Sequence, residues 1–343
     1  MVASALRRKS RLPANAGSYT WGCMGDGTRV KIGISACLLG QEVRFDGGHK
    51  RDRFLSDILG PQVEFVTVCP EVEMGLGTPR EPMRLVAVGD GLRMITTRTG
   101  IDHSDAMNRW TRRRLDELAR DHPDLCGYVL KKDSPSCGME RVKTYGQTGP
   151  PRRDGRGLFA SALIRRCPSL PVEEEGRLGD PSLRENFIER VFAFRRVKDL
   201  FAARWTIGEL VRFHTAHKMA LLAHSSLKYH DLGRLVAGAA AMPRAAVRRA
   251  YEQQFMAALS IVATPKRHAN VLTHMIGHLK KVLNSESKEE LMHTIEDYRR
   301  GLVPLVVPLT LVRHHVRACR VSSLLDQVYL DPHPRELMLR NHV

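Results

Sequence analysis

The segment Ile32-Gly-Ile-Ser-Ala-Cys37 is a short run of mostly apolar residues that ends in a cysteine. Two further cysteines follow similar runs: Cys69 ends Val63-Glu-Phe-Val-Thr-Val-Cys69, and Cys137 follows the run that begins at Tyr128. Runs of this kind are typical of buried strands in a parallel sheet, and the carboxyl ends of such strands meet at one edge. We therefore expect the three thiols to lie close together, although they are far apart in the sequence.

Strands and helices alternate around these cysteines. Runs rich in valine and isoleucine predict strands at Val30–Ala36, Val63–Val68, Leu85–Val88, Leu92–Thr97 and Gly127–Leu130. Helical patterns fall at Arg53–Leu59, Ser104–Arg120, Gly157–Arg166 and Leu183–Phe201. This alternation is typical of an α/β domain built on a parallel sheet. The cysteines are expected at the ends of its strands.

Strand signals nearly vanish beyond Thr206. Apolar residues recur at helical spacing in the windows Ile207–Ala223, Pro243–Val262, His268–Leu283 and Lys288–Tyr298. Two prolines, Pro304 and Pro308, predict a helix near 301–312 that starts late or is kinked. The chain is therefore divided into a flexible basic extension at 1–28, an α/β domain at 29–204 and an all-α helical bundle at 205–343.

The composition is that of a globular protein, with 343 residues, 43% hydrophobic residues and 27% charged residues. No apolar run approaches the roughly 18 residues of a membrane span, and no apolar segment follows the basic residues at the N-terminus. Seven cysteines without short regular spacing favour reduced thiols over a disulfide framework. We expect a cytoplasmic protein without a membrane partner, and the oligomeric state stays open.

The net charge of +17 is concentrated in the first 31 residues and in the helical half. Such an excess favours binding to nucleic acid through phosphate contacts, although a solvated basic surface explains it equally well. Five basic residues of this half would form an anion-binding groove together with nearby histidines: Lys218, Lys228, Arg267, Lys280 and Lys281. The histidines are His214, His217, His224, His268, His274 and His278. Their helical spacing allows a metal site, but polar groups lining a bundle are the favoured interpretation, because no H-E-x-x-H pattern accompanies them.

The spacing of the three strand-end cysteines restricts their chemistry. Intervals of 32 and 68 residues are neither the compact ferredoxin spacing nor the paired spacing of structural zinc. Three thiolates around a four-iron cluster would leave one iron open to a substrate, whereas free cysteines are commonly buried as small apolar groups. Polar residues near the cysteines favour a site; they are Arg44, Asp46, Glu71, Lys131, Ser134 and Ser136.

Three ordered motifs around these cysteines resemble the thiouracil desulfidase family. They are Ser35-Ala-Cys-Leu-Leu-Gly40 with Arg44-Phe-Asp-Gly47, Val68-Cys-Pro-Glu-Val72 with Gly75-Leu-Gly-Thr-Pro-Arg80, and Ser134-Pro-Ser-Cys-Gly138 preceded by Lys131. The resemblance covers about residues 30 to 170, and the helical half resembles the domain of unassigned activity in YbgA-like proteins. It implies a 4Fe–4S cluster held by Cys37, Cys69 and Cys137, with the fourth iron binding the sulfur of a thiolated pyrimidine.

The resemblance also suggests roles for the neighbouring side chains. Glu71 and Ser134 are candidates for positioning and deprotonating a water molecule that attacks the ring carbon. In the alternative interpretation, Ser134 forms a turn before Pro135 and Glu71 caps a loop. Five residues are candidates for substrate binding: Ser35, Arg44, Asp46, Lys131 and Ser136. The substrate is expected to be a thiolated nucleobase or nucleoside, with a thiolated base in RNA left open.

Two classes of function therefore remain. The first is an iron–sulfur-dependent desulfidase, and the second is a non-catalytic, nucleic-acid-associated module with a structural or redox-sensing metal site. A structural site normally closes with four protein ligands, and the motifs supply three, which favours the enzyme. The other cysteines, Cys23, Cys126, Cys167 and Cys319, lack the flanking motifs and are not expected to bind the cluster.

Overall fold

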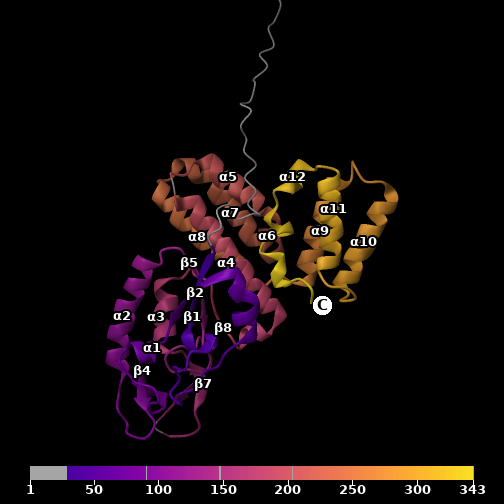
Figure 1. Ribbon diagram of the computed structural model, residues 1–343. Coiled ribbons are helices and arrows are strands. Elements are labelled where there is room, and N and C mark those ends of the chain that lie inside the picture. Colours follow the sequence, from indigo (N-terminus) through magenta and orange to yellow (C-terminus); the bar gives the residue numbers. More distant parts are fainter. Residues whose placement is uncertain (1–28, 90, 147, 203, 343) are drawn as a thin grey trace, which may run out of the picture.

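The computed structural model describes residues 29–89, 91–146, 148–202 and 204–342. Its N-terminal part contains two four-stranded sheets flanked by helices, and its C-terminal part is built from helices (Figure 1). The predicted fold class, an α/β domain followed by an all-α part, is confirmed. The predicted extension at 1–28, with Cys23, lies outside the described residues.

The first sheet is wholly parallel and has the order β2-β1-β5-β8. Its strands are β1 (Val30–Ser35), β2 (Val63–Val68), β5 (Leu125–Leu130) and β8 (Val172–Glu174). Every residue of β5 is buried, because helices cover both faces of the sheet. The strands β2, β1 and β5, each of which leads into a cysteine, are therefore direct neighbours.

A second, mixed sheet has the order β4-β3-β6-β7. Its strands are β3 (Met83–Val88), β4 (Gly91–Thr96), β6 (Val142–Tyr145) and β7 (Arg152–Gly155). The sequence predicted β3 and β4 as strands but assigned them to one parallel sheet, and that assignment is wrong. Only residues 89 and 90 separate them, so they pair as an antiparallel hairpin. The short strands β6, β7 and β8 were not predicted.

Helices cover the two faces of the parallel sheet. They are the π-helix Phe54–Leu59, α1 (Pro70–Glu73), α2 (Ser104–Asp121), α3 (Leu158–Arg166) and α4 (Pro181–Ala202). Trp110 of α2 and Phe159 of α3 pack with Tyr128 of β5 on one face. On the other face, Ile32 of β1 joins the cluster that contains Phe187 of α4. The predicted helix at Arg53–Leu59 is thus present as a π-helix.

The C-terminal part consists of eight α-helices in the described residues. They are α5 (Ile207–Ala216), α6 (Lys218–His224), α7 (Ser226–Gly238), α8 (Arg244–Leu259), α9 (Pro265–Leu279), α10 (Ser285–Arg299), α11 (Val306–Ala318) and α12 (Ser322–Leu325). None of these described helices is both long and apolar enough to cross a membrane.

The helical predictions need two corrections. The window 207–223 divides at His217, whose Nδ1 lies 2.8 Å from the carbonyl oxygen of Phe213 and competes for a helix acceptor. The helix α7 was not predicted. The expectation of a late start is confirmed for α11, which begins at Val306 and places Pro308 in its first turn.

The long helix α4 lies between the parallel sheet and the C-terminal helices (Figure 1). One hydrophobic cluster runs from Ile32 of the sheet through Phe187 and Phe192 of α4 to Tyr251 and Phe255 of α8. The two halves of the chain therefore share a core, and α4 is the element common to both.

The helix α4 packs closely against β5 at Gly127. A Cβ atom added at Gly127 would lie 2.7 Å from Cγ2 of Val191 and 3.5 Å from Cζ of Phe187. We expect Gly127→Ala to lower the free energy of unfolding by about 1–3 kcal/mol, because overpacking forces the helix away from the sheet. Urea unfolding measures this effect. Gly179→Ala is the control, since an added Cβ has no neighbour within 4 Å there. Equal stability of the two variants would contradict the close packing.

Candidate active site at the edge of the parallel sheet

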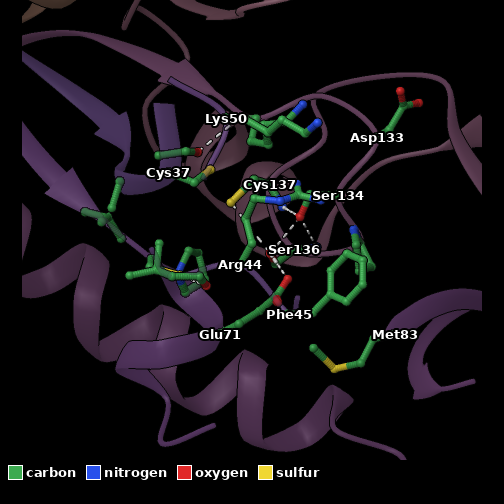
Figure 2. Close-up of a pocket in the computed structure, with 18 of the residues that line it drawn as sticks. Cys37, Arg44, Phe45, Lys50, Glu71, Met83, Asp133, Ser134, Ser136 and Cys137 are labelled. Atoms are coloured by element: carbon green, nitrogen blue, oxygen red, sulfur yellow. Dashed lines mark hydrogen bonds between the residues drawn. The ribbon is translucent and has the colours of Figure 1, made fainter. Parts of the chain in front are cut away.

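The three predicted cysteines line a single cavity of about 410 Å³. Cys37 and Cys69 lie just beyond the ends of β1 and β2, and Cys137 lies in the loop after β5. Figure 2 shows the sulfur atoms of Cys37 and Cys137 pointing toward one another. The predicted meeting of the thiols is therefore observed, and it follows from the adjacency of β2, β1 and β5.

The thiols lie in a largely dehydrated environment. Burial raises the pKa of Cys37 to about 11 and that of Cys137 to about 12, and it also raises the pKa of Cys69. The free thiols are therefore protonated at neutral pH, and a metal that binds their sulfur must displace protons. The Sγ of Cys69 donates to the Val43 carbonyl at 3.7 Å, and Cys137 Sγ lies 3.6 Å from Ser136 Oγ.

A chain of hydrogen bonds runs along the cavity from a carboxylate to two hydroxyl groups. Ser136 Oγ donates to Glu71 Oε1 at 2.8 Å, and Ser136 Oγ and Ser134 Oγ are 3.0 Å apart. Figure 2 shows this chain beside Cys137. Glu71 and Ser134, the predicted pair, thus do not touch each other, because Ser136 lies between them. Ser136 was predicted as a substrate-binding residue, and its position also links the other two.

The predicted turn at Ser134 is present as well. Its Oγ accepts from the backbone N–H groups of Ser136 and Cys137 at 3.3 and 3.1 Å, and its carbonyl accepts from Gly138 at 2.8 Å. The side chain of Ser134 therefore shapes the loop that carries Cys137 and lines the cavity at the same time. In the alternative interpretation, Glu71 caps a loop. The structure shows that Glu73 does so instead, because its Oε1 accepts from the backbone N–H of Cys69.

Arg80 lines the cavity, although it was not predicted as a site residue. Its Nη2 and Nε donate to Glu71 Oε2 at 2.5 and 3.0 Å, and Nη2 also donates to the Val43 carbonyl. The two side chains are only 8% and 12% exposed. A buried arginine nine residues after a buried glutamate ties the loop after β1 to the loop after β2. The feature of the sequence that could have identified Arg80 is its position at the end of the second motif.

Four of the five predicted substrate-binding residues line the cavity: Ser35, Arg44, Lys131 and Ser136. Asp46 does not line the cavity, so its prediction as a substrate-binding residue of this cavity is wrong. Its carboxylate accepts from Arg44 at 3.2 and 3.3 Å, so it holds Arg44 rather than facing the cavity. The Nζ of Lys131 lies 2.5 Å from Glu175 Oε1. Lining residues without a prediction include Phe45, Lys50, Met83, Lys132 and Asp133.

The remaining described cysteines lie elsewhere. Cys126 is buried in β5 within the cluster that faces α4, and its Sγ donates to the Asp124 carbonyl at 3.0 Å. Cys167 and Cys319 are partly buried and do not line the cavity. These positions leave three cysteines at the cavity, as the motifs predicted.

Five of the six histidines predicted as a cluster fall into two groups, and His278 lies outside both, with its Nδ1 3.5 Å from Ser323 Oγ. His214, His217, His224 and His268 are buried and bonded within the helical part, to Tyr251, Phe213, Ile261 and Tyr329 respectively. His274 instead lines an open groove of about 500 Å³ together with Lys218 and Arg267. Of the basic residues predicted to form a groove, Lys228, Lys280 and Lys281 do not line it. Across the described ranges, no set of three or more His, Cys, Asp or Glu side chains is arranged to hold a single metal ion.

Known proteins resemble the two halves of the chain separately. The 2-thiouracil desulfurase family model matches residues 32–175, and the DUF1722 model, of unknown function, matches residues 218–334. The uncharacterized protein YbgA of Escherichia coli is 32% identical over 44% of this chain and 90% of its own length. YbbK of Bacillus subtilis, also uncharacterized, is 29% identical over 43% of this chain and 97% of its own length.

One solved structure also matches, that of the 4Fe–4S-dependent thiouracil desulfidase TudS. It is 33% identical, covers 47% of this chain and is itself covered completely, with a TM-score of 0.38. The two family models occupy successive parts of the chain and correspond to its α/β and helical parts. The chain therefore belongs to the 2-thiouracil desulfurase family in its N-terminal half and to the YbgA-like DUF1722 family in its C-terminal part.

Proposed function

We propose that the N-terminal half is an iron–sulfur-dependent desulfidase that converts the C=S group of a thiolated pyrimidine into C=O. The observation that carries this proposal is the meeting of Cys37, Cys69 and Cys137 in one cavity, beside the hydrogen-bonded chain of Glu71, Ser136 and Ser134. The match to the 2-thiouracil desulfurase family supports it, as does the 33% identity to a 4Fe–4S-dependent thiouracil desulfidase.

The donor set fits a four-iron cluster with one open position. The cavity lining contains three cysteines, no fourth cysteine and no histidine among the described residues. Thiolates are the usual ligands of iron–sulfur clusters, and a structural zinc site would need a fourth protein ligand. When bound, such a cluster supplies an iron without a protein ligand, which acts as a Lewis acid toward the thiocarbonyl sulfur. Cys37, Cys69 and Cys137 would hold it.

The side chains beside the cysteines supply the proton transfers. Replacement of sulfur by the oxygen of water releases hydrogen sulfide, and this exchange needs no net oxidation or reduction. A water molecule held by Ser134 passes a proton through Ser136 to Glu71, along oxygen–oxygen distances of 3.0 and 2.8 Å. Arg80 fixes Glu71 through its other carboxylate oxygen, so that Oε1 stays directed at Ser136.

The cavity also suits the proposed substrate. Its volume of about 410 Å³ accommodates a thiolated nucleobase or nucleoside. Phe45 and Met83 provide an apolar wall opposite the cysteines (Figure 2), against which a flat ring can pack. Arg44 and Lys131, whose charges are paired with Asp46 and Glu175, provide N–H donors at the cavity. Ser35 supports the loop by accepting from the backbone N–H of Lys131 at 3.0 Å.

A nucleic-acid partner is a second proposal, and the groove of the C-terminal part favours it. Lys218, Arg267, His230 and His274 line this groove, and no carboxylate is among the described residues that line it. Lys218 and His278 both lower the pKa of His274, although burial is the larger cause. Positive charge without acidic neighbours attracts phosphate groups. The competing function, a non-catalytic nucleic-acid module with a structural or redox-sensing metal site, rests on the same groove.

The first test concerns the cluster ligands. We expect anaerobically purified Cys37→Ser to lose most of its iron, its brown colour and all turnover of 2-thiouracil, because the remaining two thiolates do not hold a four-iron cluster. Iron and sulfide analysis and the visible spectrum measure the loss. The matched control is Cys167→Ser, which removes a thiol away from the cavity and should retain both. A full cluster in Cys37→Ser would contradict the assignment, and a colourless wild-type protein would favour the non-catalytic module.

The second test separates proton transfer from cluster binding. Glu71→Gln should lower kcat per bound cluster by about 10²–10⁴-fold, because the amide cannot take up the proton. The variant should also be less stable, because Arg80 loses its charged partner. Loss of the thiocarbonyl absorbance gives the rate. Glu64→Gln, in β2 and away from the cavity, is the control and should behave as wild type. A Glu71→Gln variant with normal kcat would rule out this proton acceptor.

The third test concerns the groove. Lys218→Ala should weaken binding of single-stranded RNA and reduce the slope of log K against log salt concentration by about one, because one phosphate contact is lost. Lys143→Ala is the control, since Lys143 is an exposed residue of β6 outside the groove. If binding is insensitive to salt, or if both variants bind alike, the groove does not bind nucleic acid through Lys218.

A further inference from the structure

A separate cavity of about 180 Å³ lies where α4 meets the C-terminal helices. Ser182 and His342 line it, together with six buried polar residues, three of α4 and three of the helical part: Glu185, Asn186, Glu189, His224, His268 and Tyr298. None of these six residues is more than 8% exposed. The apolar part of its lining consists of Val262, Ala263, Pro265 and Leu305. The desulfidase proposal uses none of these groups.

The charged groups at this cavity are paired with each other. Arg340 Nε donates to Glu185 Oε1 at 2.8 Å, and His224 Nε2 lies 3.4 Å from Glu189 Oε2. Nδ1 of His224 lies 2.6 Å from the Ile261 carbonyl, which fixes the ring. Burial disfavours the charged form of His224, but the Glu189 carboxylate outweighs it and raises the pKa of the imidazole. His342 Nε2 also lies 3.9 Å from Glu185 Oε2. Each carboxylate at the cavity is therefore already paired within the protein, so a charged ligand would lack a free counterion.

Three polar atoms at the cavity, all on largely buried residues, have no hydrogen-bond partner within the described part of the chain. The Tyr298 hydroxyl makes no hydrogen bond, and His268 uses only Nδ1, which lies 2.8 Å from the Tyr329 hydroxyl. Asn186 uses only its amide nitrogen, which donates to the Leu259 carbonyl at 2.9 Å, so its Oδ1 is free. Groups of this kind are normally satisfied by water or by a ligand.

The arrangement of these groups restricts the ligand. Oxygen atoms of α4 accept hydrogen bonds on one side, and the Tyr298 hydroxyl and His268 Nε2 lie on helices α10 and α9. A volume of about 180 Å³ is below the range of drug-sized pockets, so the ligand is no larger than a single ring. N–H donors and C=O acceptors on a flat, uncharged ring would meet both sets of groups, and the apolar wall would contact the face of the ring.

We propose that this cavity is a second binding site, which takes a small neutral cyclic amide of the size of one pyrimidine ring. The site is distinct from the cysteine-lined cavity, and it does not depend on the proposed desulfidase activity. It lies on the helix that supports the catalytic sheet: Phe187 and Val191 of α4 pack over Gly127 of β5, whereas Glu185, Asn186 and Glu189 face the cavity. A ligand in this cavity would therefore contact α4, the helix that both halves of the chain share.

The test uses 5-fluorouracil as the probe and observes its ¹⁹F resonance with the anaerobically purified full chain. Tyr298→Phe removes only a hydroxyl group and should weaken binding by about threefold to tenfold, as expected for one neutral hydrogen bond. Glu189→Gln should weaken it more, because it removes a charged acceptor and the partner of His224. Tyr145→Phe, which removes the same hydroxyl from β6, is the control and should bind as wild type.

The probe could also bind at the cysteine-lined cavity. Ser136→Ala distinguishes the two sites, because Ser136 lines the cysteine-lined cavity and does not line the second one. If the desulfidase proposal fails, the resonance that responds to Tyr298→Phe is still expected. If no bound resonance responds to either Tyr298→Phe or Glu189→Gln, or if the probe binds the wild-type chain only in a way that Ser136→Ala abolishes, the cavity contains solvent alone and the proposal is wrong. Circular dichroism of each variant confirms that a lost signal does not come from unfolding.

Discussion

The parallel pairing of β2, β1 and β5 is the constraint on which the rest of the site depends. The strands β1 and β2 pair without interruption as far as Ser35 and Val68, so they end at the same level. Cys37 and Cys69, which follow these ends, therefore lie side by side. The loop after β5 then needs only a short turn, closed by Ser134, to bring in Cys137. A shift of one strand by a single residue would turn its side chains to the opposite face and would separate the three thiols.

A second constraint is the buried pair of Glu71 and Arg80. Removal of one partner from such a pair costs about 3–5 kcal/mol, because the other charge is left without compensation. Arg80 also binds the Val43 carbonyl, to which Cys69 donates, so the same guanidinium positions a carboxylate and supports a cysteine-bearing loop. Charge pairing, and not only hydrophobic packing, therefore sets the geometry beside the cysteines.

The helix α4 gives the two halves a common core. Its apolar residues pack on the parallel sheet and on α8, while its acidic residues enter the polar network with His224 and Arg340. If α4 moved relative to the sheet, its apolar contacts with the sheet and its polar contacts with His224 and Arg340 would both have to change. The α/β half and the helical half thus share one hydrophobic core, although separate family models describe them.

Local periodicity and the order of the motifs were enough to predict the alternation of strands and helices, the helical nature of the second half and the three cysteines at strand ends. The remaining features depend on contacts between distant segments of the folded chain. The tertiary structure paired β3 with β4 in a second sheet, placed Ser136 between Glu71 and Ser134, joined Arg80 to Glu71 and turned Asp46 toward Arg44. It also gathered Glu185, His268 and Tyr298 around one cavity. Contacts of this kind join residues from separate elements, and local patterns do not contain the distances between them.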